Sequence, residues 1–190
     1  MQMEDLINYD AETIASSNIN WEKLKGKTIL ISGATGYVSQ YIVHALLKRN
    51  DLFDANIKVI AFCRNKDKAD YRFSKYYDRS DFELLLQDIF EDIEIEQEIH
   101  YIIHTASPAG LVMSNKNPVE TFKVNVFGCD NLLKLAEQKH AEFLLFSSVD
   151  VYGKLDGKRF VESKLGELDT TDIRNVYAYA KRASENLCVC

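Results

Sequence analysis

The chain has 190 residues, of which 46% are hydrophobic and 27% charged, and its formal net charge at pH 7 is −6. The apolar content suffices for a folded core and excludes a disordered protein, while the acidic balance argues against a nucleic-acid partner. No apolar run approaches the roughly 20 residues that span a bilayer, and the acidic start differs from a secretory signal. We therefore expect a globular cytoplasmic protein that binds neither nucleic acid nor membrane.

Short, nearly continuous apolar runs, typical of strands covered on both faces, recur along the chain. They lie at 27–32, 57–63, 82–87, 100–106 and 142–148. Helical patterns lie between them, at 38–48, 66–77, 91–98 and 118–140, and a last helix is expected from about 173 to 190. This alternation predicts an α/β fold with an open parallel sheet and helices on both faces. Residues 1–24 are expected to form a helical arm, with Trp21 and Leu24 packed against the sheet.

The connection from the first strand to the first helix of this sheet contains two glycines. Gly33 directly follows the strand and Gly36 opens the helix, so the backbone can turn tightly and approach a pyrophosphate near free N–H groups. Ser39 occupies the position where such turns usually carry a third glycine, and serine is small enough for helix and strand to pack closely. The stretch predicts a Rossmann-type doubly wound sheet with strand order 3-2-1-4-5, and residues 25–190 as a dinucleotide-binding domain.

Other strand ends carry residues that a dinucleotide would use, and ligands of such sheets bind at the carboxyl ends of the strands. Asp88 and Ile89 follow the third strand and offer a carboxylate and a backbone amide to an adenine. Small residues at Ala106 and Ser107 would let the cofactor pass close to the chain. After the second strand, Arg64 stands near the place where an acid usually binds the ribose of NAD, and a guanidinium suits the extra phosphate of NADP. The residues therefore favour NADP slightly over NAD.

Tyr177 and Lys181 are four residues apart on the last predicted helix and hence lie on one face, whereas Tyr179 points away. An ammonium group beside a phenol favours the phenolate, which can act as a base. Neither the four cysteines nor the four histidines have the spacing of metal ligands, and we expect no metal site and free thiols.

Six segments, in this order, resemble the extended short-chain dehydrogenase/reductases, which include nucleotide-sugar epimerases, dehydratases and decarboxylases. They are SGATGYVS, QDI, HTASPA, NPVETFKVNVFGCDNLLKLA, FLLFSSVDVYG and YAYAKRASENLC, and the resemblance covers 27–190. With Glu162 and Arg174 added, the chain looks most like UDP-glucuronate decarboxylases. The resemblance implies transient oxidation of a sugar hydroxyl to a keto group, with Tyr177 as acid/base, Lys181 on the nicotinamide ribose and Ser148 bonded to the reacting hydroxyl. It also implies tightly bound NAD, which conflicts with the preference suggested by Arg64.

The candidate catalytic residues are thus Ser148, Asp150, Tyr177 and Lys181, and the candidate substrate contacts are Ser107, Ser148 and Arg174. The candidate cofactor-binding residues are Gly33, Thr35, Gly36, Tyr37, Val38, Arg64, Asp88, Ile89, Thr105, Ala106, Ser107, Asn125, Tyr177 and Lys181. Asp150 is either an acid that assists the reaction or a solvated loop residue. Asn125 either supports the site from the preceding helix or bonds a neighbouring backbone group.

Two other functions remain open from the sequence, a carbonyl reductase that consumes NADPH and a dinucleotide-binding module without catalysis. The resemblance further implies later strands and a C-terminal region that holds the nucleotide sugar, whereas this sequence stops at Cys190. We expect a fragment of a longer enzyme, a vacant sixth strand position with an exposed sheet edge, and a homodimer formed through the Tyr177–Lys181 helix.

Overall fold

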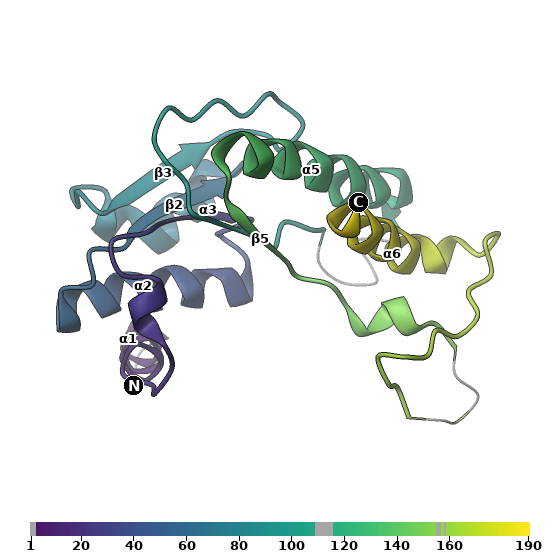
Figure 1. Ribbon diagram of the computed structural model, residues 1–190, viewed down its shortest axis with the longest axis horizontal. Coiled ribbons are helices and arrows are strands. Elements are labelled where there is room, and N and C mark those ends of the chain that lie inside the picture. Colours follow the sequence, from purple (N-terminus) through teal and green to yellow (C-terminus); the bar gives the residue numbers. More distant parts are fainter. Residues whose placement is uncertain (1–2, 109–115, 155–156, 158) are drawn as a thin grey trace.

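The computed structural model describes residues 3–108, 116–154, 157 and 159–190. Its centre is a parallel sheet of five strands in the order β3-β2-β1-β4-β5, which confirms the predicted order (Figure 1). The strands are β1 (Thr28–Ser32), β2 (Lys58–Cys63), β3 (Phe82–Leu86), β4 (Tyr101–His104) and β5 (Glu142–Leu145). In the central strand, Ile29 lies opposite Val59 of β2 and Tyr101 of β4.

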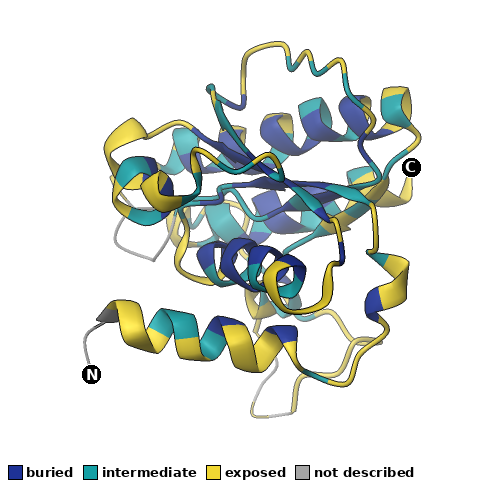
Figure 2. Ribbon diagram, turned by 90° about the vertical axis from the view of Figure 1, so that its left-hand side faces the viewer, coloured by how far each residue is buried: buried dark blue, intermediate teal, exposed yellow. Residues whose placement is uncertain are grey.

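Helices cover both faces of the sheet (Figures 1 and 2). Apolar side chains of α2 (Tyr37–Phe53) and α3 (Lys66–Phe73) bury one face, and α5 (Pro118–Lys139) buries the other. The last helix, α6 (Val176–Val189), packs against α5. Short 3₁₀ turns lie at Trp21–Lys23, Ser74–Tyr76, Val149–Tyr152 and Ile173–Asn175. Within the part of the chain that is described, no helix is both long and apolar enough to cross a membrane.

The N-terminal arm contains α1 (Met3–Ala15), which packs along α2 through the buried residues Ala11 and Ala15. Arg49 of α2 donates a hydrogen bond of 2.9 Å from Nη1 to the carbonyl of Ala15 and lies over the ring of Trp21. Trp21 is buried in the apolar cluster that contains sheet residues such as Ile29, and Leu24 packs on the same cluster as expected. The arm is therefore fixed to the body of the domain.

The expected helix at 91–98 is wrong, because the connection from β3 to β4 is irregular there. Isoleucines alternate with polar residues at Ile93, Ile95 and Ile99, a period of two that points them to the same side of an extended chain. All three pack on the cluster beneath α5. A helix would turn these side chains to different faces, so the extended course buries more apolar surface.

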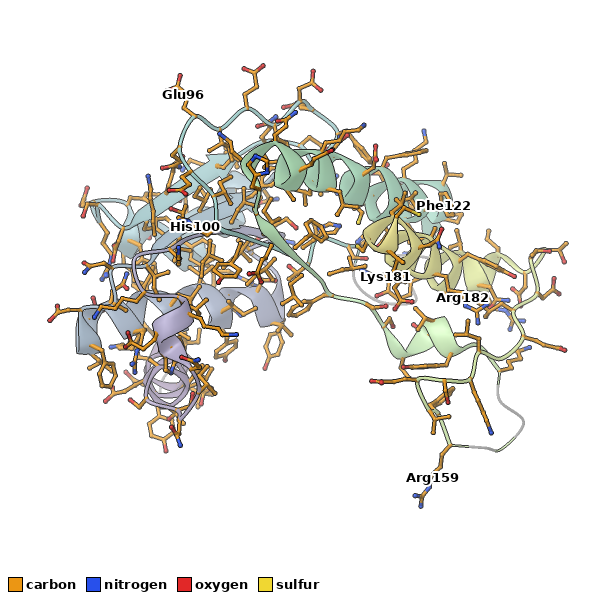
Figure 3. All side chains as sticks on the ribbon, viewed as in Figure 1. Glu96, His100, Phe122, Arg159, Lys181 and Arg182 are labelled. Carbon is orange, nitrogen blue, oxygen red and sulfur yellow. The ribbon has the colours of Figure 1, made fainter. Side chains whose placement is uncertain are left out.

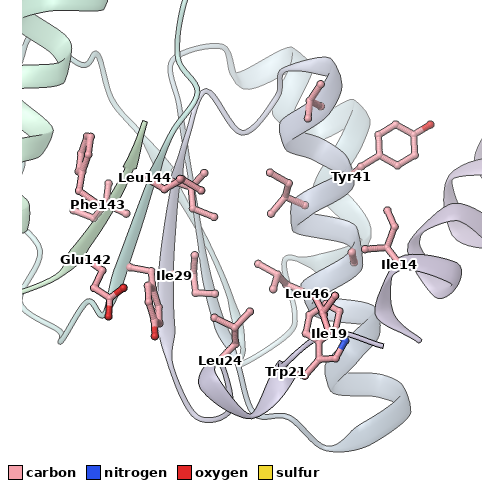
Figure 4. Close-up of a pocket in the computed structure, with 16 residues that line it drawn as sticks. Ile14, Ile19, Trp21, Leu24, Ile29, Tyr41, Leu46, Glu142, Phe143 and Leu144 are labelled. Carbon is pink, nitrogen blue, oxygen red and sulfur yellow. The ribbon is translucent and has the colours of Figure 1, made fainter. Parts of the chain in front are cut away.

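Strand β5 forms one edge of the sheet, and beside it lies a groove of about 570 Å³ (Figure 4). Figure 4 shows the groove between the sheet and α2, with Trp21 and Ile14 of the arm at its far side. Leu144 of β5 lines it and remains 54% exposed. Within the described residues no strand pairs with the outer side of β5, which is the exposed edge expected from the sequence.

Candidate dinucleotide site

Gly33 forms the turn after β1 with a backbone conformation that other residues rarely adopt. Its φ is +65°, and a Cβ there would lie 2.7 Å from the Cα of Ala106 and 2.9 Å from its nitrogen. The turn closes through a bond of 2.7 Å from the amide of Gly36 to the carbonyl of Gly33, and α2 begins at the next residue. Both the φ value and the close approach of the β4 end require glycine at this position.

Ser39 joins the first turn of α2 to the end of β4. It is buried, and its hydroxyl lies 2.6 Å from that of Thr105, which in turn donates to the carbonyl of Ser32 at 2.5 Å. Arg72 of α3 donates to the carbonyl of Gly36 at 3.0 Å and also to that of Thr35. The small side chain expected at position 39 for close packing thus also adds a hydrogen bond between the turn and β4.

A cavity of about 570 Å³ opens at the carboxyl ends of the strands, beside this turn. It brings together many of the predicted cofactor-binding residues: Gly33, Thr35, Gly36, Arg64, Ile89, Thr105, Ala106 and Ser107. The side chains of Tyr37 and Val38 do not line it; Tyr37 is 76% exposed and Val38 faces the groove beside β5. Residues 109–110, which end the HTASPAG motif, lie outside the described residues.

Arg64 lines the cavity and is flanked by two carboxylates. Its Nη1 lies 3.7 Å from Oδ2 of Asp88 and 3.5 Å from Oε1 of Glu120, at the start of α5. Asn65, which follows it, caps α3 by accepting a bond of 2.8 Å from the amide of Lys68. Asn65 and Lys68 also line the cavity, although neither was predicted from the sequence. An asparagine just before a helical pattern was the available signal.

Lys181 and Tyr177 lie on one face of α6, with Nζ 5.9 Å from the centre of the phenol ring, as the spacing predicted. Lys181 is only 2% exposed and donates a bond of 2.7 Å to the carbonyl of Phe146, just after β5. Burial lowers the pKa of its ammonium group to about 8. This bond attaches α6 to the carboxyl end of β5, and the glycine turn follows the carboxyl end of β1 in the same sheet.

Hydrogen bonds connect the ends of β1, β4 and β5 below the cavity. The amide of Phe146 donates to the carbonyl of His104 at 3.0 Å, and Nδ1 of His104 lies 2.7 Å from the hydroxyl of Ser32. That hydroxyl also accepts from the amides of Thr105 and Ala106 at 3.2 and 3.3 Å. Since Ser32 accepts from two amides, we assign its proton to Nδ1 of His104, which places the imidazole proton on Nε2, a buried atom without a hydrogen-bond partner among the described residues. Burial lowers the pKa of His104 to about 3, so the ring is neutral.

Asp150 lies in the 3₁₀ turn Val149–Tyr152, which follows β5, and Ser148 caps the start of this turn. The turn brings them together, because the Ser148 hydroxyl lies 3.2 Å from both the amide and Oδ2 of Asp150. Arg174 is directed to Asp172 instead, with 2.7 Å from Nη2 to Oδ2. Neither the turn nor Arg174 lines the cavity.

Asn125 is fully buried in α5 rather than exposed in the cavity. Its amide donates to the carbonyl of Thr121 at 2.8 Å, and its own backbone carbonyl accepts from the hydroxyl of Ser184 at 2.9 Å. Asn125 therefore bonds a neighbouring backbone group and helps to hold α6, which carries Tyr177 and Lys181, against α5.

The model of the NAD dependent epimerase/dehydratase family matches residues 29–189 of this chain. UDP-glucuronic acid decarboxylase 2 of Arabidopsis thaliana is 34% identical over 167 residues, which are 87% of this chain and 35% of that protein. Among solved structures, an epimerase of Methanothermobacter thermautotrophicus has a TM-score of 0.71 at 20% identity. The match covers 98% of this chain and 51% of the epimerase chain. A UDP-glucuronic acid 4-epimerase from Bacillus cereus, in complex with UDP-glucuronic acid and NAD, has a TM-score of 0.65 at 22% identity, covering 85% of this chain and 51% of its own.

The structural likenesses establish the shared fold, and the matched family model covers most of the chain. The chain spans about 35 to 45% of the length of curated relatives that it matches. It belongs to the NAD dependent epimerase/dehydratase family.

Proposed function

We propose that the full-length protein containing this chain is an NAD(P)-dependent enzyme that modifies a nucleotide sugar by epimerisation, dehydration or decarboxylation. In this proposal residues 25–190 bind the dinucleotide and residues 1–24 are an arm. The observation that carries the proposal is the cavity beside Gly33 together with Lys181, which attaches the Tyr177 helix to the same sheet edge. Similarity to UDP-glucuronic acid decarboxylases supports a UDP-uronate or related nucleotide sugar as the substrate.

The residues fit a dinucleotide. Gly33 and Gly36 line the cavity at the start of α2, whose N–H groups favour a pyrophosphate. Gly33, Gly36 and Ser107 would hold this central part, with Asp88 and Ile89 at the adenine. Tyr177 and Lys181 would hold the nicotinamide ribose, and Asn125 would support them from α5.

When bound, the dinucleotide supplies a hydride acceptor that later returns the hydride. Tyr177 removes the proton of the sugar hydroxyl while Ser148 orients that hydroxyl through a hydrogen bond. The keto group of the oxidised sugar makes a neighbouring proton or carboxylate labile, and Asp150 assists the proton transfer that follows. Arg174 and Ser107 contact the substrate in this proposal.

The preference for NADP rests on the cations around the cavity. Arg64 and Lys68 line it, and Asn65 caps α3 between them. A phosphate on the adenosine ribose would meet both cations, although Asp88 and Glu120 already compensate the charge of Arg64. Because two cations line the cavity, we propose NADP rather than NAD as the cofactor.

The direct test is the variant Tyr177→Phe in the full-length protein, assayed with UDP-glucuronate and related nucleotide sugars. We expect turnover to fall by roughly 10² to 10⁴-fold. The fold should persist, because within the described residues the Tyr177 hydroxyl makes no hydrogen bond. Tyr9→Phe, at an exposed position of α1, is the matched control. Unchanged turnover would remove Tyr177 from its role, and wild type inactive on all these sugars would refute the proposal.

A net carbonyl reductase is the second candidate, and Arg64 in the cavity favours it because reductive enzymes use NADPH. The two candidates differ in the fate of the cofactor. A nucleotide-sugar enzyme regenerates it in every turnover, whereas a reductase accumulates oxidised cofactor, which absorbance at 340 nm follows as about one mole per mole of product.

We also propose that the protein forms a homodimer through α6 and its neighbour α5. Exposed apolar side chains on these helices support it, including Val119, Phe127 and Val189, which are 66%, 51% and 84% exposed. Phe127→Glu would then shift the full-length protein from dimer to monomer in analytical ultracentrifugation.

A further inference from the structure

Helix α6 contacts the rest of the site through a second face, beside the one that carries Tyr177 and Lys181. Arg182 donates from Nε to the carbonyl of Val151 at 2.7 Å and from Nη2 to that of Gly166 at 3.0 Å. Tyr179 donates from its hydroxyl to the carbonyl of Leu168 at 2.7 Å. Figure 3 labels Lys181 and Arg182 on α6, next to the turn that follows β5.

The carbonyl of Val151 belongs to the turn that carries the candidate acid. Within this turn the amide of Val151 bonds the carbonyl of Ser148 at 3.2 Å, and the amide of Gly153 bonds that of Asp150 at 3.1 Å. Val151 itself is 5% exposed. The turn is compact, so a bond to its centre sets the position of Ser148 and Asp150 together.

The second carbonyl belongs to a segment that returns to the turn. The amide of Gly166 donates to the carbonyl of Tyr152 at 2.7 Å, and the amide of Lys154 donates to that of Glu167 at 3.0 Å. A Cβ on Gly153 would lie 2.7 Å from the carbonyl oxygen of Glu167 and 3.2 Å from Nη2 of Arg182. The guanidinium is therefore seated in a closely packed site between the turn and the returning segment.

We propose that Arg182 is a positioning residue that fixes the turn bearing Ser148 and Asp150 relative to the helix bearing Tyr177 and Lys181. A planar guanidinium can make two directed, charge-assisted bonds to two carbonyls, which lysine cannot reproduce. Since small misplacements of reacting groups slow catalysis strongly, loss of this contact acts on kcat more than on KM. This inference rests on the proposed function for its catalytic consequence, but not for the contact itself.

The test compares Arg182→Gln and Arg182→Lys in the full-length protein by hydrogen exchange and by kinetics. In Arg182→Gln, the amides of Val151 and Gly153 should exchange about tenfold faster, while those of β1 and β2 keep their protection. With an active wild type, kcat should fall about 10- to 100-fold with KM changed less than about threefold. Millimolar guanidinium chloride should restore part of the kcat of Arg182→Gln, and Arg182→Lys should remain impaired.

Lys134→Gln is the matched control, because Lys134 is exposed on α5 and, among the described residues, pairs only with Asp130 one turn away. If Arg182→Gln does not fold, Tyr179→Phe removes the neighbouring bond to Leu168 and should speed exchange at 166–168 alone. Wild-type exchange at Val151 and Gly153 in both Arg182 variants would overturn the inference, as would an unchanged kcat. An inactive wild type would refute the proposed function, whereas the exchange result would still decide whether Arg182 fixes the turn.

Discussion

At the scale of single residues, a comparison of Gly33 with Gly26 distinguishes two reasons why a position requires glycine. Gly26 has nearly the same backbone, with φ of +68° against +65°, but a Cβ there meets nothing within 4 Å. At Gly33 the Cβ would meet the main chain of Ala106, which cannot rotate away as a side chain could. Gly26 is thus required by its backbone conformation alone, whereas Gly33 is required by its conformation and by the close approach of β4.

We predict that Gly26→Ala lowers the free energy of unfolding by about 1 to 2 kcal/mol, the cost of the left-handed conformation. Gly33→Ala should lower it by about 3 kcal/mol or more, because β4 must also shift, and should abolish dinucleotide binding. Urea denaturation and calorimetric titration with NAD and NADP measure both effects. Equal destabilisation by the two variants would show that the contact with Ala106 does not matter.

The sequence predicted those site residues whose role depends on local spacing. Gly33 was recognisable because it stands between a strand and a helix, and Lys181 because it follows Tyr177 by one helical turn. The bonds between Ser39 and Thr105 and between Arg182 and Val151 join residues 66 and 31 positions apart. No local pattern encodes such pairs, because they depend on how the elements pack.

At the scale of elements, the five strands were predictable because both faces of a parallel sheet are buried and the runs are apolar throughout. The prediction of a helix at 91–98 was wrong because it relied on the usual helix between parallel strands, although the isoleucines there alternate with polar residues. Tertiary burial of Ile93, Ile95 and Ile99 decides the conformation. Periodicity was the better guide to this connection than the usual order of elements.

The extended conformation of this connection can be tested with proline. Glu94 is exposed and, in the described structure, its backbone amide has no hydrogen-bond partner, so Glu94→Pro should change the free energy of unfolding by less than about 1 kcal/mol. Lys134→Pro, at an exposed position in the middle of α5, should cost about 3 kcal/mol or more. A loss of similar size in both variants, measured by urea denaturation, would mean that 91–98 is helical after all.

At the scale of the whole molecule, two buried histidines make the stability depend on pH. Burial lowers the pKa of His104 to about 3, and burial with the nearby charges of Lys75 and Arg72 lowers that of His44 to about 4. In the unfolded chain both titrate near 6.5, so above that pH neither contributes. As the pH falls below 6.5 the unfolded state takes up protons that the folded state does not, and the folded state loses stability.

We predict that the free energy of unfolding decreases between pH 6.5 and 5, with a slope approaching about 1.4 kcal/mol per pH unit for each histidine. Replacing both by glutamine should remove most of this slope even if it lowers the stability at pH 7. Urea denaturation at several pH values measures it. A wild-type profile that is flat in this range would contradict the buried, neutral state of the two rings.

In the proposed function, one cavity at the carboxyl ends of β1, β2 and β4 holds the dinucleotide, and Tyr177 and Lys181 act beside it. A crystal structure of the full-length protein with NAD or NADP bound would show where the dinucleotide lies. We expect the pyrophosphate against Gly33 and Gly36, with the Tyr177 hydroxyl and the Lys181 ammonium at the nicotinamide ribose. A dinucleotide bound away from the Gly33 turn, or a phenol of Tyr177 directed away from the dinucleotide, would rule out this site.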